Sequence, residues 1–345
     1  MKICVLNASN PGPTMVLETD SYVDYRMGRA SCFEGSERVK QCSSWHSWAY
    51  ALESEFFVIG KPGWERVYEY DAVIILVNRD MELLKPLVRK LGLMKKKTAI
   101  SFHEGVQDLT AGSGVNGENV ALRWIQLVDL VKESTFYINI FGQMVPFFEG
   151  LFGKDKVKFC SHAIPSDWNH GFSKPLRERK YDFLIGTRTF NQRLSRNTLA
   201  SLATMNRYAK EGYSVHYLSE DGDVSSLFGK LGFSDIVVHK GPLSWTDWLK
   251  MVSDFRFLVH HDTSSNLGQI VYDASLVDVL TLGSTTWNAI CLDVDDGGSL
   301  KKLDYLIHHA LTDSDWLFSR NRCMKDFKND HSPNHIRWIL ESVFQ

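Results

Sequence analysis

The sequence predicts an α/β fold made of two successive domains, each a parallel sheet with crossover helices. Short β-branched runs alternate with helix-length amphipathic stretches along most of the chain, which is typical of parallel sheets covered by helices. The alternation pauses once near the middle and then restarts. A length of 345 residues also suits about two domains of roughly 100–200 residues each.

The first half contains the most apolar strand candidate of the chain. Asp71–Val77 is a continuous apolar run, which indicates a strand buried on both faces. The stretch Met81–Leu91 after it is long enough for a crossover helix. The other expected elements are, in chain order, strand Lys2–Leu6, helix Ser44–Leu52, strands Phe56–Ile59 and Thr98–Phe102, helix Val120–Val131, and strands Thr135–Asn139 and Val157–Cys160.

The pause falls at Ile164–Lys180, where Pro165, Gly171, Pro175 and a mixed-charge stretch predict a linker. Beyond it, the expected elements are strand Tyr181–Ile185, helix Ser195–Lys210, strand Ser214–Leu218, helix Val224–Leu231, strand Ile236–His239, helix Trp245–Val252, strand Phe257–His260, helix Gln269–Leu276, strand Val279–Leu282 and a last helix, Asn334–Phe344. We therefore expect an N-terminal Rossmann-like domain over 1–165 and a second over 176–325, followed by a C-terminal helix within 326–345.

Composition excludes several classes of protein. Hydrophobic residues make up 44% and charged residues 23%, as in soluble globular enzymes, and no run approaches the ~18 apolar residues of a membrane span. Six scattered cysteines without CxxC spacing argue against disulfide frameworks and zinc sites, and favour a reducing cytoplasm. The net charge of −2 lacks the basic excess usual in passive nucleic-acid binders.

Two segments of the second half carry features of a site for a phosphorylated ligand. Arg188 and Arg193 lie five residues apart in the loop between a strand and a helix, where planar, permanently charged donors suit a diphosphate. The run Arg256–Ser284 has the pattern strand, polar turn, short helix and apolar stretch. At the N-terminus of such a helix, unpaired backbone N–H groups and the helix dipole favour an anionic ligand. In this run, Asp273 is a carboxylate suited to ribose hydroxyls.

These segments resemble the donor-binding region of GT-B-fold glycosyltransferases, in particular the retaining, family-4-like group. Gly268, Asp273, Ala274 and Gly283 fall in register on that group's pattern, and Gly186-Thr187-Arg188 with Arg193 resembles its phosphate-binding pair. Ser265 stands where the family has a glutamate near the donor sugar, with Asp262 further upstream. This departure leaves the sugar unidentified.

The resemblance implies two Rossmann-like domains facing across a cleft, the first for the acceptor and the second for the donor, with the last helix packing back on the first. It implies that Arg188 and Arg193 stabilise the departing diphosphate, while Asp273 holds the ribose. The backbone amides of Asn266, Leu267 and Gly268 then meet phosphate or sugar oxygens.

Further candidates lie at other predicted strand ends. By resemblance, His103 contacts the donor sugar near the reacting carbon, and Glu104 and Gly12 lie on the acceptor side. His239-Lys240-Gly241 ends a strand of the second half, so that Lys240 is a candidate contact of the nucleotide base. The GxGxxG motif is absent, which gives nicotinamide or flavin binding little support.

An acidic run, a histidine pair and a basic cluster bear on metal binding and on surface contacts. Asp293-Val294-Asp295-Asp296 lies beside two glycines, as in a surface turn, and His260-His261 lacks ligand partners at metal spacing. We therefore expect no metal and no cofactor other than the nucleotide-sugar co-substrate. A basic cluster is interpreted as a solvated helix face and turn, or alternatively as a contact for an anionic membrane or a DNA backbone; its members are Lys85, Arg89, Lys90, Lys95, Lys96 and Lys97.

The function expected by resemblance is transfer of a sugar from a nucleotide-diphosphate sugar to an acceptor hydroxyl, with retention and without metal. The acceptor is left open between a saccharide, a small molecule and a hydroxymethylated base of DNA, the last as in viral DNA-modifying glucosyltransferases. A nucleotide-sugar epimerase and a catalytically inactive nucleotide-sugar-binding module remain alternatives.

Overall fold

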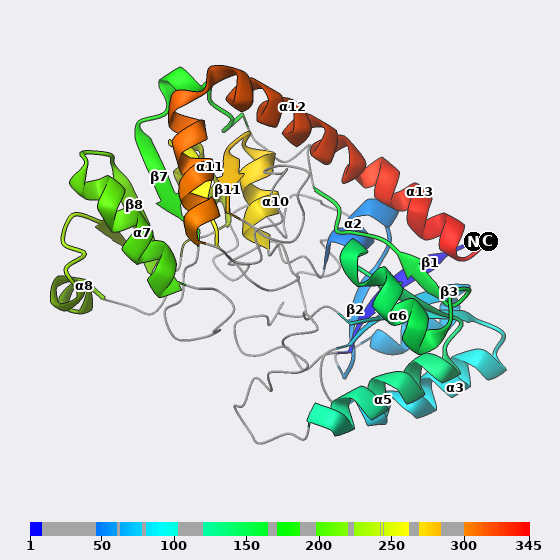
Figure 1. Ribbon diagram of the computed structural model, residues 1–345. Helices are drawn as coiled ribbons and strands as arrows, with labels where there is room; N and C mark the ends of the chain where they lie inside the picture. Colours follow the sequence, from blue (N-terminus) through cyan, green and yellow to red (C-terminus); the bar gives the residue numbers. More distant parts are fainter. Residues whose placement is uncertain are drawn as a thin grey trace. The chain divides into compact units, whose positions relative to one another are not determined.

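The computed structural model describes residues 1–8, 46–60, 63–77, 81–102, 120–164, 171–186, 198–219, 224–241, 243, 245–261, 269–283 and 300–345. They form two compact units (Figure 1). The first comprises Met1–Pro165 and His331–Gln345, and the second comprises Ser166–Asp330. The C-terminal segment of the chain therefore belongs to the first unit.

The first unit contains a six-stranded parallel sheet in the order β2-β1-β3-β4-β5-β6. Its strands are β1 (Ile3–Asn7), β2 (Phe56–Val58), β3 (Ala72–Val77), β4 (Lys97–Phe102), β5 (Phe136–Asn139) and β6 (Val157–Phe159). Every residue of β3 is buried, as expected for a central strand whose two faces both pack against helices. The strand order reverses between β1 and β3, because β2 lies on one side of β1 and β3 on the other.

The helix α3 (Lys85–Leu93) of the first unit buries one apolar face. In it, Leu87, Val88 and Leu91 are buried at helical spacing, and Pro86 lies in the first turn, where its missing N–H costs nothing. The remaining helical segments are α2 (Ser47–Leu52), η3 (Trp64–Glu69), η4 (Met81–Leu84), α5 (Val120–Glu133), η5 (Gly142–Met144), α6 (Val145–Phe152) and α13 (Pro333–Val343).

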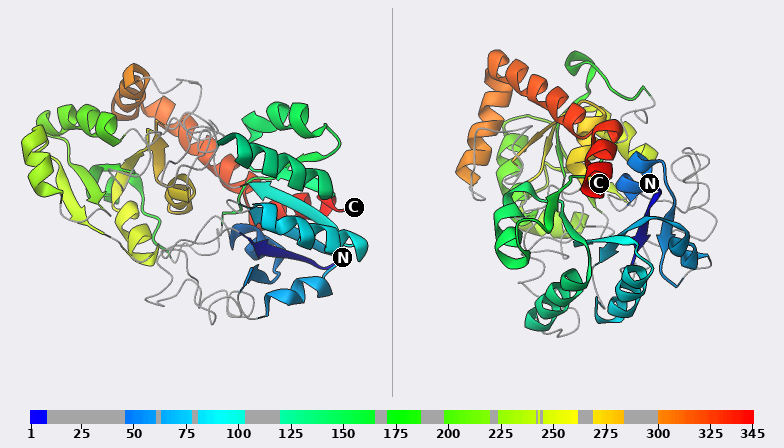
Figure 2. Two further views of the ribbon diagram at one scale, coloured as in Figure 1. Left: turned by 90° about the horizontal axis from the view of Figure 1, so that it is seen from below. Right: turned by 90° about the vertical axis from the view of Figure 1, so that its right-hand side faces the viewer.

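The last helix packs against a helix near the start of the chain. Ser332 caps α13 by accepting a hydrogen bond from the backbone N–H of His335, and α13 then buries Ile336, Leu340 and Val343. Its Arg337 donates to the carbonyl of Leu52 at the end of α2. The two helices lie side by side in the right-hand view of Figure 2, and the chain termini lie close together in this unit.

The second unit contains a five-stranded parallel sheet in the order β11-β10-β7-β8-β9. Its strands are β7 (Tyr181–Ile185), β8 (Val215–Ser219), β9 (Val237–Lys240), β10 (Phe255–Val259) and β11 (Leu280–Leu282). Its helical segments are η7 (Leu176–Glu178), α7 (Thr198–Lys210), α8 (Ser225–Leu231), α9 (Trp245–Ser253), α10 (Gln269–Leu276), α11 (Leu300–Thr312) and α12 (Ser314–Asp330). The predicted α/β class with two parallel sheets is confirmed.

Three helices were missed by the sequence reasoning. The residues of α6 are apolar on most sides, a pattern that strands and buried helices share. The helices α11 and α12 follow one another with only Asp313 between them. Asp313 accepts a hydrogen bond from the backbone N–H of Trp316 at 2.9 Å and thereby begins the second helix. Among the described helices, none is long and apolar enough to cross a membrane.

The half-buried side chain of Arg179 connects the segment before β7 to the sheet of the second unit. The guanidinium of Arg179 donates to the carbonyls of Lys174 at 3.0 and 3.1 Å and of Asp278 at 2.7 Å. It also donates to the carbonyls of Phe255 and Arg256, both at 3.3 Å. Burial lowers the pKa of Arg179 to about 10. The planar fork of donors thus holds together three backbone segments that are far apart in the sequence.

We expect Arg179→Lys to lower the free energy of unfolding by about 2 kcal/mol, because an ammonium group cannot reach all of these carbonyls and leaves some without a donor. The measurement is urea unfolding followed by tryptophan fluorescence. Arg177→Lys is the matched control, since the Arg177 side chain is 86% exposed. Equal midpoints for the two variants would contradict the structural role of Arg179.

Candidate functional site

The carboxyl edge of the second sheet has the topology of a ligand site. From β7 the chain proceeds to β8 and β9 on one side, and then returns to β10 and β11 on the other. At such a reversal the connections leave toward opposite faces of the sheet, and ligands of open α/β sheets bind in the crevice outside these strand ends. Gly186 follows β7 at this point, and His260 and His261 follow β10.

Gly186 is required by close packing at this edge. Its N–H donates to the carbonyl of Val259 at 2.7 Å. A Cβ at this position would lie 3.1 Å from Cδ1 of Ile270 and 3.2 Å from that carbonyl oxygen. The absence of a side chain therefore allows the first turn of α10 to pack directly against the ends of β7 and β10.

Most of the residues predicted to contact the donor or the acceptor lie outside the described residues. These are Gly12, His103, Glu104, Arg188, Arg193, Asp262, Ser265, Asn266, Leu267 and Gly268. Their roles stay predictions. The strands that precede these segments in the sequence are described. Arg188 and Arg193 follow β7 in the sequence, and residues 262–268 lie between β10 and α10.

Asp273 is 1% exposed and lies in α10. The indole N–H of Trp248 in α9 donates to its Oδ2 atom at 3.0 Å. This carboxylate therefore links the two helices that flank β10 in the sequence. The structure gives Asp273 a part in packing, and its role toward a ribose stays a prediction.

Lys240 ends β9, where its backbone pairs with Ser219 of β8. The preceding His239 shares a 2.8 Å hydrogen bond between its Nε2 and Nδ1 of His216, and the rings stack at 5.0 Å. Burial, and secondly the neighbouring His239, lower the pKa of His216 to about 4; burial also lowers the pKa of His239. Both rings are thus neutral near pH 7, and the proposed contact of Lys240 with a base stays untested.

His260 and His261 were read from the sequence only as a pair unsuited to metal. The structure buries both completely at the carboxyl edge, which sequence reasoning missed. The sequence signal that could have pointed to this edge was the position of both histidines directly after an apolar strand. Within the described part of the chain, no group of three or more histidine, cysteine, aspartate or glutamate side chains is placed to hold a metal ion.

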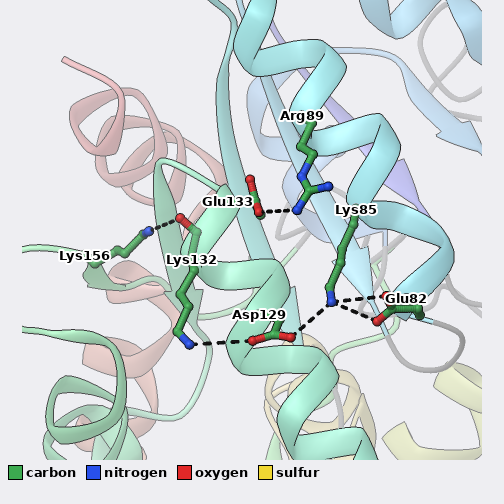
Figure 3. Close-up of polar contacts among 7 residues, drawn as sticks. All are labelled: Glu82, Lys85, Arg89, Asp129, Lys132, Glu133 and Lys156. Atoms are coloured by element: carbon green, nitrogen blue, oxygen red, sulfur yellow. Dashed lines mark hydrogen bonds and ion pairs between the residues drawn. The ribbon is translucent and has the colours of Figure 1, made fainter.

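Two members of the basic cluster of the first unit, Lys85 and Arg89, form ion pairs with carboxylates of α5 (Figure 3). Lys85 of α3 contacts Asp129 of α5 at 3.1 Å, and Arg89 contacts Glu133 at 2.7 Å. Hydrogen bonds from these two cations lower the pKa of Asp129 and of Glu133.

Two further members of the cluster also have partners. The ammonium of Lys90 lies 4.2 Å from the ring centre of Tyr68, and Lys97 donates to the carbonyl of Phe344. Lys85 and Arg89 thus form interhelical ion pairs, whereas Lys90 and Lys97 make contacts that leave their charge in place.

Comparisons with known proteins place the fold. No family model matches the chain, and no curated protein matches it. Among solved structures, a trehalose-phosphate synthase (UDP-forming) from Burkholderia xenovorans aligns with a TM-score of 0.61 and 8% identity over 100% of both chains. An alpha-glucosyltransferase in complex with UDP and a 13-mer DNA containing a HMU base aligns with a TM-score of 0.60 and 9% identity, again over 100% of both chains.

Other matches are longer proteins. The chain covers 56% of the matched chain of the GtfA/B complex, with a TM-score of 0.55 and 9% identity. For the pneumococcal O-GlcNAc transferase GtfA in complex with UDP and GlcNAc, 79% of this chain aligns with 57% of that chain at 10% identity. These likenesses, at low identity and over the whole chain in the first two cases, show that the chain has the GT-B fold.

We expect Trp248→Phe to reduce the free energy of unfolding by about 1–3 kcal/mol, because the buried carboxylate of Asp273 loses a hydrogen-bond donor. Urea unfolding gives the change. Trp338→Phe serves as the control, since Trp338 is 66% exposed on α13. The interhelical role of Asp273 is refuted if both variants unfold at the wild-type midpoint.

The His216 pair predicts a pH dependence of stability. The pKa of His216 is about 4 in the folded chain and about 6.5 when unfolded, so between these values the unfolded chain binds more protons. Stability is therefore lost as pH falls from about 6.5 to about 4. The variant His216→Gln keeps an amide partner for His239 and should show a shallower loss between pH 7 and pH 5 by urea titration. An unchanged slope, equal to that of a variant at exposed His308, would count against this assignment.

Proposed function

We propose that this protein is a glycosyltransferase that moves a sugar from a nucleotide-diphosphate sugar to an acceptor hydroxyl. The observation that carries the proposal is the whole-chain likeness to sugar-transferring enzymes, including an alpha-glucosyltransferase solved with UDP and with UDP-glucose. The carboxyl edge at β7 and β10 supports it, because Gly186 packs there against the first turn of α10, and Arg188 follows Gly186 by two residues in the sequence.

In this proposal the second unit binds the donor. Arg188 and Arg193 pair with the diphosphate and stabilise the charge that builds on its oxygens as the sugar–phosphate bond breaks. Amides of 266–268 add further donors, Asp273 holds the ribose and Lys240 lies near the base. The donor is taken to be a uridine nucleotide, since UDP is the nucleotide named in several of the matched structures.

We further propose that transfer occurs with retention. The acceptor oxygen attacks the anomeric carbon from the face that the nucleotide leaves, the bond to the phosphate oxygen breaks, and that oxygen takes the acceptor proton. His103 positions the sugar, and Glu104 and the loop of Gly12 lie toward the acceptor. The arginines supply the positive charge for the leaving group, and on this proposal the reaction needs no metal ion.

The acceptor that we favour is a saccharide or a small molecule rather than DNA. The matched structures include both an enzyme with glucose-6-phosphate and one with DNA containing a HMU base. In this chain two residues of the basic cluster, Lys85 and Arg89, are paired with Asp129 and Glu133, and the net charge is −2. Both facts disfavour a strongly salt-dependent contact with a DNA backbone.

The proposed compartment is the cytoplasm. Among the described residues, Cys4, Cys160 and Cys323 are free thiols, in keeping with a reducing environment. Burial raises the pKa of the Cys4 and Cys160 thiols, so neither is suited to act as a nucleophile.

The proposal is tested by incubating the full chain with UDP-glucose and UDP-N-acetylglucosamine and measuring UDP release. Release that depends on an added saccharide supports a transferase, whereas release that depends on duplex DNA containing hydroxymethylated bases identifies the alternative acceptor. Interconversion of donor sugars without an acceptor identifies an epimerase. Binding without any turnover identifies a catalytically inactive binding module, and a lack of both binding and turnover rejects the proposal.

We expect Arg188→Ala or Arg193→Ala to lower kcat by about 10- to 100-fold, the effect of losing one charge-assisted hydrogen bond of roughly 1.5–3 kcal/mol. Steady-state UDP release measures the change. Arg177→Ala, which removes an exposed arginine of the same unit, should leave turnover unchanged. Wild-type turnover in both site variants would remove the phosphate-binding role of this loop.

A further inference from the structure

A buried histidine at the carboxyl edge of the second sheet has no hydrogen-bond partner. His261 follows β10 by two residues and is 0% exposed. Both of its ring nitrogens, Nδ1 and Nε2, lack a partner among the residues that the structure describes. A neutral imidazole has one N–H donor and one acceptor nitrogen, so both polar functions of this ring are unsatisfied.

Such a group costs stability, and most buried polar atoms avoid this cost. Another buried histidine of this sheet illustrates the usual solution, since His216 bonds to His239 at 2.8 Å. A ligand that supplies the missing hydrogen-bond partner accounts for an unpaired polar side chain at a strand end.

The position of His261 within the sheet supports this explanation. Ile185 of β7 pairs with Val259 of β10 on one side and with Tyr217 of β8 on the other. His261 and Ser219 each lie two residues further along, so they occupy matching places on the strands that flank β7. The hydroxyl of Ser219 is likewise buried and unpartnered among the described residues. The edge beside the end of β7 thus carries two unsatisfied polar groups.

The ligand group that fits this edge is anionic. The first turn of α10 lies here, since Ile270 packs beside Gly186, and a helix N-terminus favours negative charge. In the sequence, Arg188 follows Gly186 by two residues. The carboxylate of Asp273 is bonded to Trp248. The first turn of α10 and the unpaired imidazole of His261 therefore favour a phosphate group at this edge.

We propose that His261 donates a hydrogen bond to the diphosphate of the nucleotide-sugar donor. This inference rests on the proposed function. It adds a binding residue that lies in the run 256–284 but is not one of the positions that carry the resemblance, and its unpaired nitrogens gain a partner when the donor binds.

The test compares UDP binding and stability in the full chain. In His261→Leu, the UDP dissociation constant measured by calorimetry should rise about ten-fold or more, while the affinity for uridine should stay unchanged. The melting temperature without ligand should stay equal or rise, because an unsatisfied polar group has been removed. His261→Gln, which keeps an amide donor, should recover part of the UDP affinity.

Tyr137→Phe is the matched control. The Tyr137 hydroxyl in β5 of the first unit is also fully buried and unpartnered among the described residues, so its removal should preserve or raise stability without changing UDP affinity. Unchanged UDP affinity in His261→Leu, or an equal loss of uridine and UDP affinity, would overturn the role in diphosphate binding. A wild-type chain that binds neither UDP nor a nucleotide sugar would instead reject the proposed function.

Discussion

Parallel strand pairing is the constraint on which both units of this protein depend. Because every described strand pair in the two sheets is parallel, each connection must cross over a sheet face, and the strand ends of one kind gather at one edge. Central strands such as β3 are consequently apolar along their whole length. Polar and glycine residues come directly after the strands, at the edge where ligands bind.

The second unit shows two different environments for polar side chains near its sheet. At the amino ends of β10 and β11, the half-buried Arg179 is surrounded by backbone carbonyls, so its charge is well satisfied and joins distant segments. At the carboxyl ends, His261 is fully buried and has no hydrogen-bond partner among the described residues. Since burial without a partner is costly, the first arrangement serves stability, and the second is what a ligand site requires.

In the first unit, two basic side chains of α3 form ion pairs with carboxylates of α5. Lys85 and Arg89 of α3 pair with Asp129 and Glu133 of α5, and the two helices lie side by side (Figure 1). Exposed pairs of this kind contribute little stability singly, but they neutralise a surface that would otherwise attract anions. These two ion pairs therefore reduce the positive charge that this helix face could offer to a nucleic-acid acceptor.

The sequence by itself determined the α/β class, the alternation of strands and helices in both halves and the order of the segments that resemble a donor site. These follow from local properties, namely apolar runs, helical spacing and turn residues such as Gly186. Only the tertiary structure decided which partners these residues have. Asp273 accepts a hydrogen bond from Trp248 of the neighbouring helix, Lys85 and Arg89 pair with carboxylates 44 residues away, and His261 is buried without a partner among the described residues. Such contacts depend on strand order and helix packing, which local sequence patterns do not encode.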